Sequence, residues 1–151
     1  MREVTVEAVV WADPDAVFAD LADFPGYVRR APSVREVVMG EGNSTSSWEV
    51  SFRDGILRWV EADAFDAGAR TIDFRQTEGD MEFFEGSWLV EPAAEGARIV
   101  FSARFDLGVP GLAAFLEPVA QRALEENIVE LVRSLFADAA PRFAPGKVPA
   151  P

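Results

Sequence analysis

Two acidic residues, Glu61 and Asp63, lie in an apolar stretch of the sequence between Trp59 and Phe65. In an extended strand, residues two apart point to the same face and lie roughly 6.5–7 Å apart. A carboxylate buried among apolar side chains is costly, so it either titrates at a raised pH or finds a partner. Such a pair could act as the acid and base of a proton-transfer reaction. The alternative is a slipped register, a bulge or a sheet edge that returns both side chains to water.

Histidine and cysteine are both absent from the 151 residues. Their absence excludes disulfide bonds, thiolate nucleophiles, serine–histidine triads and the side chains that most often bind transition metals. Acid–base chemistry would therefore fall to carboxylates, to Lys and Arg, or to Tyr27, the single tyrosine. We expect a protein with no metal ion and no cofactor.

The charge and hydropathy of the chain limit its partners. It has 14 basic and 26 acidic residues, a net charge of −12, whereas nucleic acids and anionic membranes bind clustered Lys and Arg. No segment approaches the roughly 18 consecutive apolar residues of a membrane span, and the first residues lack a signal-peptide apolar region. We expect a cytoplasmic protein, monomer or homodimer, with no nucleic-acid partner and no membrane insertion.

The periodicity of the sequence predicts mostly strands. Hydrophobic residues make up 49% of the chain, which favours a folded core. Asp13-Pro14 is typical of a helix start and precedes two short helices that end near Arg30. Apolar residues at helical spacing predict a long helix between Pro110 and Leu135. Alternating runs bounded by turn residues predict strands over 3–11, 34–40, 46–53, 56–65, 70–77, 82–91 and 97–106.

This order of elements predicts an α+β fold in one domain, residues 1–138, followed by a disordered tail rich in Pro and Ala, residues 139–151. A seven-stranded curved antiparallel sheet would wrap around the long C-terminal helix, with the two short helices after the first strand. Because one helix covers so wide a sheet, the space left between them should form a cavity for an apolar or aromatic molecule.

The hairpin at Asp54-Gly55 determines which face each side chain occupies, because this dipeptide favours a two-residue turn. Such a turn pairs Arg53 with Ile56 and places Glu61 opposite Trp48 on one side and Phe74 on the other. Aromatic surroundings should raise the pKa of Glu61 towards neutrality, where a general base works best. The inward set on the two strands is then Trp48, Val50, Phe52, Leu57, Trp59, Glu61, Asp63 and Phe65.

The later strands follow by the same parity argument. A three-residue loop at 78–80 directs Trp88 inward, whereas a two-residue loop would direct Glu85 inward, and we favour the first because it buries the indole. The remaining inward residues are Ile72, Phe74, Gln76, Phe84, Gly86, Val90, Ile99, Phe101, Ala103 and Phe105.

The candidate ligand-binding residues are the aromatic and amide side chains expected at the cavity. Some of them have a structural alternative: the tryptophans could belong to the core, Asn127 could be a buried satisfied amide, and Tyr27 could serve packing alone. The candidates are Tyr27, Trp48, Trp59, Phe74, Gln76, Phe84, Trp88, Phe101 and Asn127, with Glu61 and Asp63 as candidate catalytic residues.

Several segments resemble a known superfamily. Residues 13–18 (DPDAVF) and 21–27 (LADFPGY) resemble the opening of SRPBCC, or START-like, domains, which have the helix-grip fold. Residues 86–92 (GSWLVEP), residues 101–105 and the final helix resemble the polyketide cyclase/dehydrase and coenzyme-Q-binding branch. The likeness covers about residues 2–137 and implies the fold that the strand pattern predicts.

Residues 59–76 look like the aromatase/cyclases of bacterial aromatic polyketide synthesis. The resemblance implies binding of a poly-β-ketone chain, aldol ring closure and loss of water, with the chain possibly delivered by an acyl carrier protein. Those enzymes have an arginine four residues after the tryptophan that matches Trp59, and here that position is Asp63. Their mechanism therefore does not transfer directly, although enolisation by a carboxylate would be chemically coherent.

Two other functions fit the same resemblance. The coenzyme-Q-binding likeness implies a non-catalytic carrier or chaperone for a quinone or lipid, which needs the cavity but no acid. A partner-binding module would instead have a cavity filled by side chains and an exposed apolar patch.

Overall fold

The computed structural model describes residues 1–53, 55–108 and 113–144. Within them one antiparallel eight-stranded sheet has the order β2-β3-β4-β5-β6-β7-β1-β8. Its strands are β1 (Arg2–Val10), β2 (Val34–Met39), β3 (Thr45–Phe52), β4 (Gly55–Asp66), β5 (Thr71–Gly79), β6 (Phe83–Ala93), β7 (Gly96–Asp106) and β8 (Arg142–Phe143). The α-helices are α1 (Pro14–Ala22), α2 (Tyr27–Arg30) and α3 (Ala113–Leu135), with 3₁₀ turns η1 (Phe24–Gly26), η2 (Glu41–Asn43) and η3 (Ala137–Ala139).

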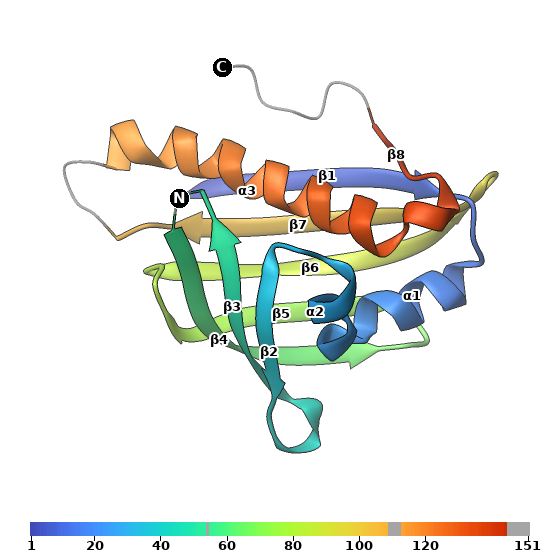
Figure 1. The fold of residues 1–151 in the computed structure, drawn as a ribbon, viewed down its shortest axis with the longest axis horizontal. Helices are drawn as coiled ribbons and strands as arrows, with labels where there is room; N and C mark the ends of the chain where they lie inside the picture. Colours follow the sequence, from blue (N-terminus) through green and yellow to red (C-terminus); the bar gives the residue numbers. More distant parts are fainter. Residues whose placement is uncertain (54, 109–112, 145–151) are drawn as a thin grey trace.

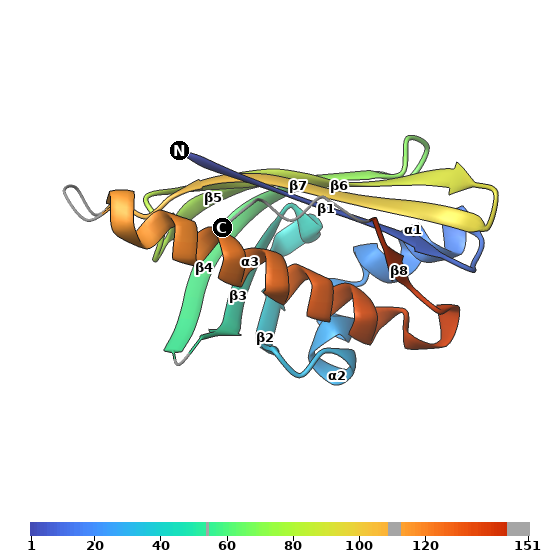
Figure 2. The ribbon, with the colours of Figure 1, turned by 90° about the horizontal axis from the view of Figure 1, so that it is seen from above.

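The long helix α3 crosses one face of the sheet, and β2, β3 and β4 turn towards that same side (Figures 1 and 2). Apolar side chains of the inner face and of α3 meet there to form the core. The structure confirms the expected α+β helix-grip fold, with its seven strands and the two short helices after β1. None of the helices in the described part of the chain is long and apolar enough to cross a membrane.

The chain beyond α3 adds an eighth strand that the sequence did not predict. Arg142 and Phe143 pair with Val9 and Ala8 of β1. Phe143 packs against the core, and the Arg133 guanidinium lies 5.0 Å from the centre of its ring. The prediction of a disordered tail from residue 139 is therefore wrong for residues 139–144, because the Trp11 N–H donates to the Ala139 carbonyl (2.9 Å), the Ala144 N–H donates to the Glu7 carbonyl (3.0 Å) and Phe143 packs against the core. Residues 145–151 lie outside the described residues.

Helix α1 begins as the sequence predicts. The Asp13 carboxylate accepts hydrogen bonds from the backbone N–H groups of Asp15 (3.1 Å) and Ala16 (3.2 Å), and Pro14 occupies the first helical position. A cap of this kind satisfies N–H groups that have no partner inside the helix.

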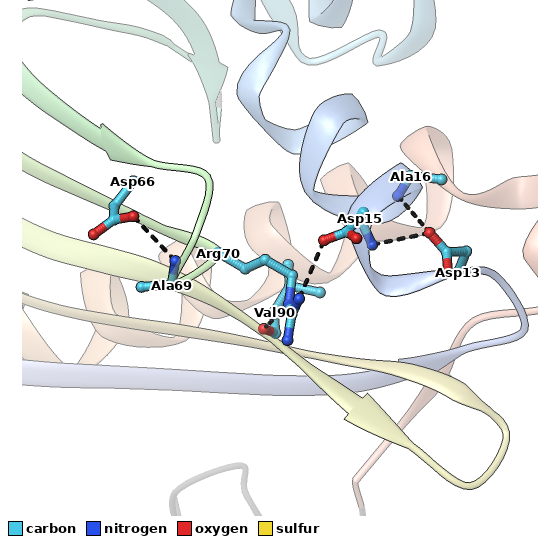
Figure 3. A network of polar contacts seen from close by, with 7 residues as sticks. All are labelled: Asp13, Asp15, Ala16, Asp66, Ala69, Arg70 and Val90. Atoms are coloured by element: carbon cyan, nitrogen blue, oxygen red, sulfur yellow. Dashed lines mark hydrogen bonds and ion pairs between the residues drawn. The ribbon is translucent and has the colours of Figure 1, made fainter.

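The turn between β4 and β5 is fastened to α1 and β6 (Figure 3). Arg70, at φ 56°, donates to the Asp15 carboxylate (3.1 Å) and to the Val90 carbonyl (3.2 Å). Within the turn, the Asp66 carboxylate accepts from the Ala69 N–H at 3.0 Å. These contacts hold the end of β4 that follows the acidic pair.

The β3–β4 hairpin is shifted by two residues from the predicted register. The last pair is Phe52 with Gly55, not Arg53 with Ile56, and Arg53 takes up the left-handed conformation at φ 57°. Because side chains alternate with a period of two, this shift leaves every residue on its predicted face. It changes the neighbours, however: Trp48 lies opposite Trp59, and Glu61 lies opposite Ser46. The predicted Glu61–Trp48 pairing is therefore wrong.

The β4–β5 hairpin shows the same two-residue shift. Its turn spans residues 67–70, so that Glu61 lies opposite Gln76 and Asp63 opposite Phe74, with a bulge between Val60 and Glu61. The predicted pairing of Glu61 with Phe74 is corrected accordingly. Both carboxyl-bearing residues remain on the inner face.

The face chosen for residues 82–91 is confirmed. Trp88 is buried, and Glu85 lies on the outer face, where it forms an ion pair with Arg104. The expected inner residues of β7 are all buried: Ile99, Phe101, Ala103 and Phe105.

The close approach of β6 and β7 at Gly86 generates a stability prediction. A Cβ added at Gly86 would lie 2.2 Å from the Ser102 carbonyl oxygen and 2.9 Å from the Ala103 Cα. Since these are backbone atoms, Gly86→Ala must separate the strands, and we expect a loss of about 1–3 kcal/mol in the free energy of unfolding. Urea denaturation measures this loss. Ser87→Ala, one residue along on the same strand, is the control, and equal stability of the two variants would contradict the packing described.

Candidate functional site

An internal cavity of about 80 Å³ lies between the sheet and α3. The helix contributes Leu124, Asn127, Ile128 and Leu131 to its wall. Eight of the nine predicted ligand residues line it, together with Glu61, whereas Gln76 and Asp63 do not. The aromatic part of the wall consists of Phe24, Tyr27, Phe52, Trp48, Trp59, Phe74, Phe84, Trp88 and Phe101.

The aromatic rings that line the cavity pack on one another. Trp48 and Trp59 are stacked, with ring centres 5.7 Å apart and an interplanar angle of 3°. Trp88 meets Phe101 edge to face at 4.7 Å. Ligand pockets usually measure about 300–1,000 Å³, so this cavity must widen to admit a molecule with fused rings.

A larger hollow of about 690 Å³ lies on the opposite, outer face of the sheet. It is open to solvent, and charged side chains of neighbouring strands, including Asp73, Arg75, Glu85 and Arg104, border it. Because this outer hollow is open and bordered by charged side chains, it does not enclose a ligand or exclude water. The inner cavity is therefore the candidate site.

Glu61 brings a carboxyl group to the aromatic wall. Only 3% of the residue is exposed, which excludes the slipped register that would have solvated it. The Trp59 indole N–H donates to Glu61 Oε1 at 2.7 Å. Since an indole nitrogen can only donate, this oxygen acts as an acceptor.

Asp63 lies behind Glu61 on the same face of β4 and is half-buried. The Ser46 hydroxyl donates to Asp63 Oδ2 at 2.6 Å, and the Trp48 indole N–H donates to the Ser46 oxygen at 2.8 Å. Asp63 Oδ1 is buried and has no other hydrogen-bond partner, which leaves it to the neighbouring carboxyl group of Glu61. Hydrogen bonds therefore run from Trp48 through Ser46 to Asp63 and from Trp59 to Glu61, so that the acidic pair lies between the two indoles.

The two carboxyl groups of the pair differ in how strongly their surroundings favour the protonated form. Burial, reinforced by the hydrogen bond to Asp63 and the charge on it, raises the pKa of Glu61 to about 10. Burial also raises the pKa of Asp63, against the hydrogen bonds from Glu61 and Ser46, which lower it. Glu61 is therefore the member of the pair that keeps its proton at neutral pH, and the hydrogen bonds to Asp63 favour the ionised form of that residue. The pKa of Glu61 is raised, as the sequence predicts, but it is raised well above neutral pH and not merely towards it. Glu61 alone therefore cannot be an ionised base.

Three other predicted polar side chains have protein partners. The Tyr27 hydroxyl donates to the Leu21 carbonyl at 2.5 Å, and burial raises the pKa of this phenol. The amide nitrogen of Gln76 donates to the Met81 carbonyl at 2.7 Å, and that of Asn127 donates to the Ser51 carbonyl at 3.0 Å. Their binding roles remain predictions, with Tyr27 contributing its ring and not its proton.

Ser46 is the functional candidate that sequence reasoning missed. It is buried, with 1% of its surface exposed, and it connects Trp48 to Asp63. The signal was present, because extending the inward alternation of Trp48 and Val50 by one step reaches Ser46. Among the described residues, no group of three or more acidic side chains is placed to hold a metal ion.

Solved structures share the fold over nearly the whole chain. The protein TTHA0849 from Thermus thermophilus is 28% identical, with a TM-score of 0.81 over 91% of this chain and 97% of the other. The Zhui aromatase/cyclase from Streptomyces sp. R1128 is 23% identical, with a TM-score of 0.77 over 91% and 94%. A START superfamily protein from Mycobacterium smegmatis is 18% identical, with a TM-score of 0.67 over 91% and 95%. No curated protein sequence matches the chain.

A sheet that grips a long C-terminal helix around an apolar cavity defines an SRPBCC-type protein. The family model described as polyketide cyclase/dehydrase and lipid transport matches residues 1–138. The chain belongs to this family, whose description covers both catalysis and lipid transport.

The shared proton predicts how stability depends on pH. Above the ordinary glutamate pKa of 4.5 the unfolded chain releases a proton that folded Glu61 keeps up to about pH 10. Wild-type stability should therefore fall as the pH rises through this window. In Glu61→Gln the amide replaces the protonated carboxyl, so this loss disappears, and the variant should be more stable by on the order of 1–3 kcal/mol at neutral pH.

Urea unfolding at several pH values between about 5 and 9 measures the effect. Glu78→Gln, which alters an exposed glutamate on β5, is the matched control and should follow the wild-type curve. Parallel stability curves for wild type and Glu61→Gln would show that Glu61 titrates as it does in the unfolded chain.

Proposed function

We propose that the protein binds an uncharged poly-β-ketone or aromatic ketone in its cavity and promotes aldol cyclisation and loss of water. The observation that supports this most is the pair of acidic side chains beside a wall of aromatic rings, in which the pKa of Glu61 is raised to about 10 and Asp63 accepts a hydrogen bond from Ser46. A protonated carboxyl next to a carboxylate can both donate and accept protons, which is what these reactions need.

The wall of the cavity favours an uncharged ligand. Among its described residues are no Arg or Lys side chains, so nothing there would compensate a ligand carboxylate or phosphate. Stacked and edge-on rings suit planar, conjugated molecules. The Glu61 carboxyl is the polar group that a ketone oxygen or an acidic C–H group would meet.

The proton transfer can be written through the pair. The C–H bond between two carbonyls breaks, its proton moves to Glu61 Oε1, and the proton already on Glu61 passes to Asp63. The electron pair of the resulting enolate then forms the new C–C bond to a second carbonyl of the same chain, whose oxygen takes a proton back from the pair. Loss of water repeats the sequence, with a C–H proton taken up and a proton given to the departing hydroxyl.

Non-catalytic transport of a quinone or lipid is the second candidate. It is favoured by the fact that Glu61 provides the one carboxyl group among the described residues of the wall, while the Tyr27 hydroxyl is already bonded. A carrier needs no proton transfer, so binding without exchange of ligand protons would identify it.

Ligand binding should be visible in tryptophan fluorescence. Titration with benzoylacetone, an uncharged aromatic 1,3-diketone, should quench the emission, because Trp48, Trp59 and Trp88 line the cavity. Trp59→Phe should remove part of the quenching. Trp11→Phe, which alters an exposed indole outside the cavity, should leave the quenching unchanged. Absence of quenching in the wild type would contradict an accessible cavity.

Enolisation can be measured without knowing the natural substrate. The protein should accelerate exchange of the central C–H protons of benzoylacetone with deuterium oxide, followed by NMR. Glu61→Gln should bind the diketone within a few-fold of wild type but lower the catalysed rate by roughly a hundredfold or more. Glu78→Gln should behave as wild type. Equal exchange rates in wild type and Glu61→Gln, with binding intact, would overturn catalysis and favour the carrier.

A further inference from the structure

Ser46 and the Trp48 indole form a second layer behind the acidic pair that the proton transfer does not itself use. Ser46 is 1% exposed, and its oxygen lies 2.6 Å from Asp63 Oδ2 and 2.8 Å from Trp48 Nε1. Ser46 lies directly opposite Glu61 in the β3–β4 ladder. The backbone pairing that places Glu61 at the cavity therefore also places this hydroxyl beside Asp63.

The two indoles give the hydrogen-bond chain a direction. Trp48 N–H can only donate, so it occupies an acceptor site of Ser46 and leaves the single hydroxyl proton free to point at Asp63. Trp59 N–H likewise occupies Oε1 of Glu61, which leaves Oε2 to hold the carboxyl proton. The Ser46 hydroxyl is thus turned towards Asp63 Oδ2, whereas Asp63 Oδ1 is buried and has no partner other than the neighbouring carboxyl group of Glu61.

We propose that Ser46 is a positioning residue of the acidic pair, whose hydroxyl, oriented by Trp48, keeps Asp63 ionised and able to take up the second proton. This inference rests on the proposed function for its catalytic consequence, but not for its effect on Asp63. Without the hydroxyl, Asp63 would take up a proton at higher pH, and a pair that already holds two protons can accept none from a ligand.

The other groups near the pair leave this role to Ser46. On the inner face of β4 the titratable groups are Glu61 and Asp63 themselves, and α2 presents Tyr27, whose pKa burial raises, so that it stays neutral. Gln76 of β5 and Asn127 of α3 are uncharged amides. No Arg or Lys side chain is among the groups that shift the pKa of Asp63, which is lowered by the hydrogen bonds from Glu61 and Ser46.

The test follows Asp63 directly by carbon-13 NMR of side-chain carboxyl groups during a pH titration. In Ser46→Ala the Asp63 midpoint should move to higher pH by about one unit or more, because a hydrogen bond to a charged group is lost. Ser47→Ala, which alters the exposed serine next in sequence, should leave it unchanged. An unchanged Asp63 midpoint in folded Ser46→Ala would overturn the proposal.

If the alanine variant does not fold, the variants Ser46→Thr and Ser46→Val test the role of the hydroxyl instead. Their side chains have similar size, and only threonine keeps a hydroxyl. The Asp63 midpoint should be near wild type in the threonine variant and raised in the valine variant. Equal midpoints in these two variants would contradict a role for the hydroxyl.

The benzoylacetone exchange assay separates positioning from a structural role. In Ser46→Ala the acidic limb of the pH profile should move upward, lowering the rate about tenfold on that limb, while the plateau at higher pH stays unchanged. A uniform fall across all pH values would indicate a structural role and overturn the proposal. If wild type shows no exchange at all, the proposed enzymatic function fails, and the NMR titration still decides the role of Ser46.

Discussion

The pairing of β4 between β3 and β5 determines the chemistry available to this protein. It directs two carboxyl groups, Glu61 and Asp63, to the inner face of the sheet, where water is largely excluded. Two ionised carboxylates cannot be accommodated there without a cation, so the pair keeps one proton. The aromatic wall excludes water from Glu61, while the Trp59 indole donates to Glu61 and the Ser46 hydroxyl donates to Asp63. These contacts stabilise the two carboxyl groups inside the fold.

The elements around β4 restrict its movement and so preserve the pair. Arg70 ties the turn after β4 to α1 and β6, and the Trp48–Trp59 stack joins the inner faces of β3 and β4. The aromatic rings also account for the small volume of the cavity, because the rings that surround Glu61 fill the space beside it. Binding of a large ligand must therefore separate some of these rings while leaving the pair in place.

Much of this arrangement could be predicted from the sequence, because strand faces depend only on parity. Both hairpins are shifted by two residues from the predicted register, yet Trp59, Glu61 and Asp63 keep their inner positions. Neighbours across the ladder were predicted wrongly, since they depend on where a turn closes, and Arg53 and Arg70 take up left-handed conformations that the sequence does not signal. The hydrogen bonds of Ser46 and the final strand at Phe143 were missed because each depends on a contact between segments distant in sequence.

Infrared spectroscopy tests the central claim, that a proton remains on Glu61 at neutral pH, most directly. The folded wild-type protein should show the C=O stretching band of a protonated carboxylic acid at about pH 7 to 8, where exposed carboxyl groups are ionised. In a Glu125→Gln background, which removes the other buried glutamate whose pKa is raised, that band should be absent in Glu61→Gln and retained in Glu78→Gln. A wild-type spectrum without a protonated carboxyl band, or a band that persists unchanged in Glu61→Gln, would contradict the account.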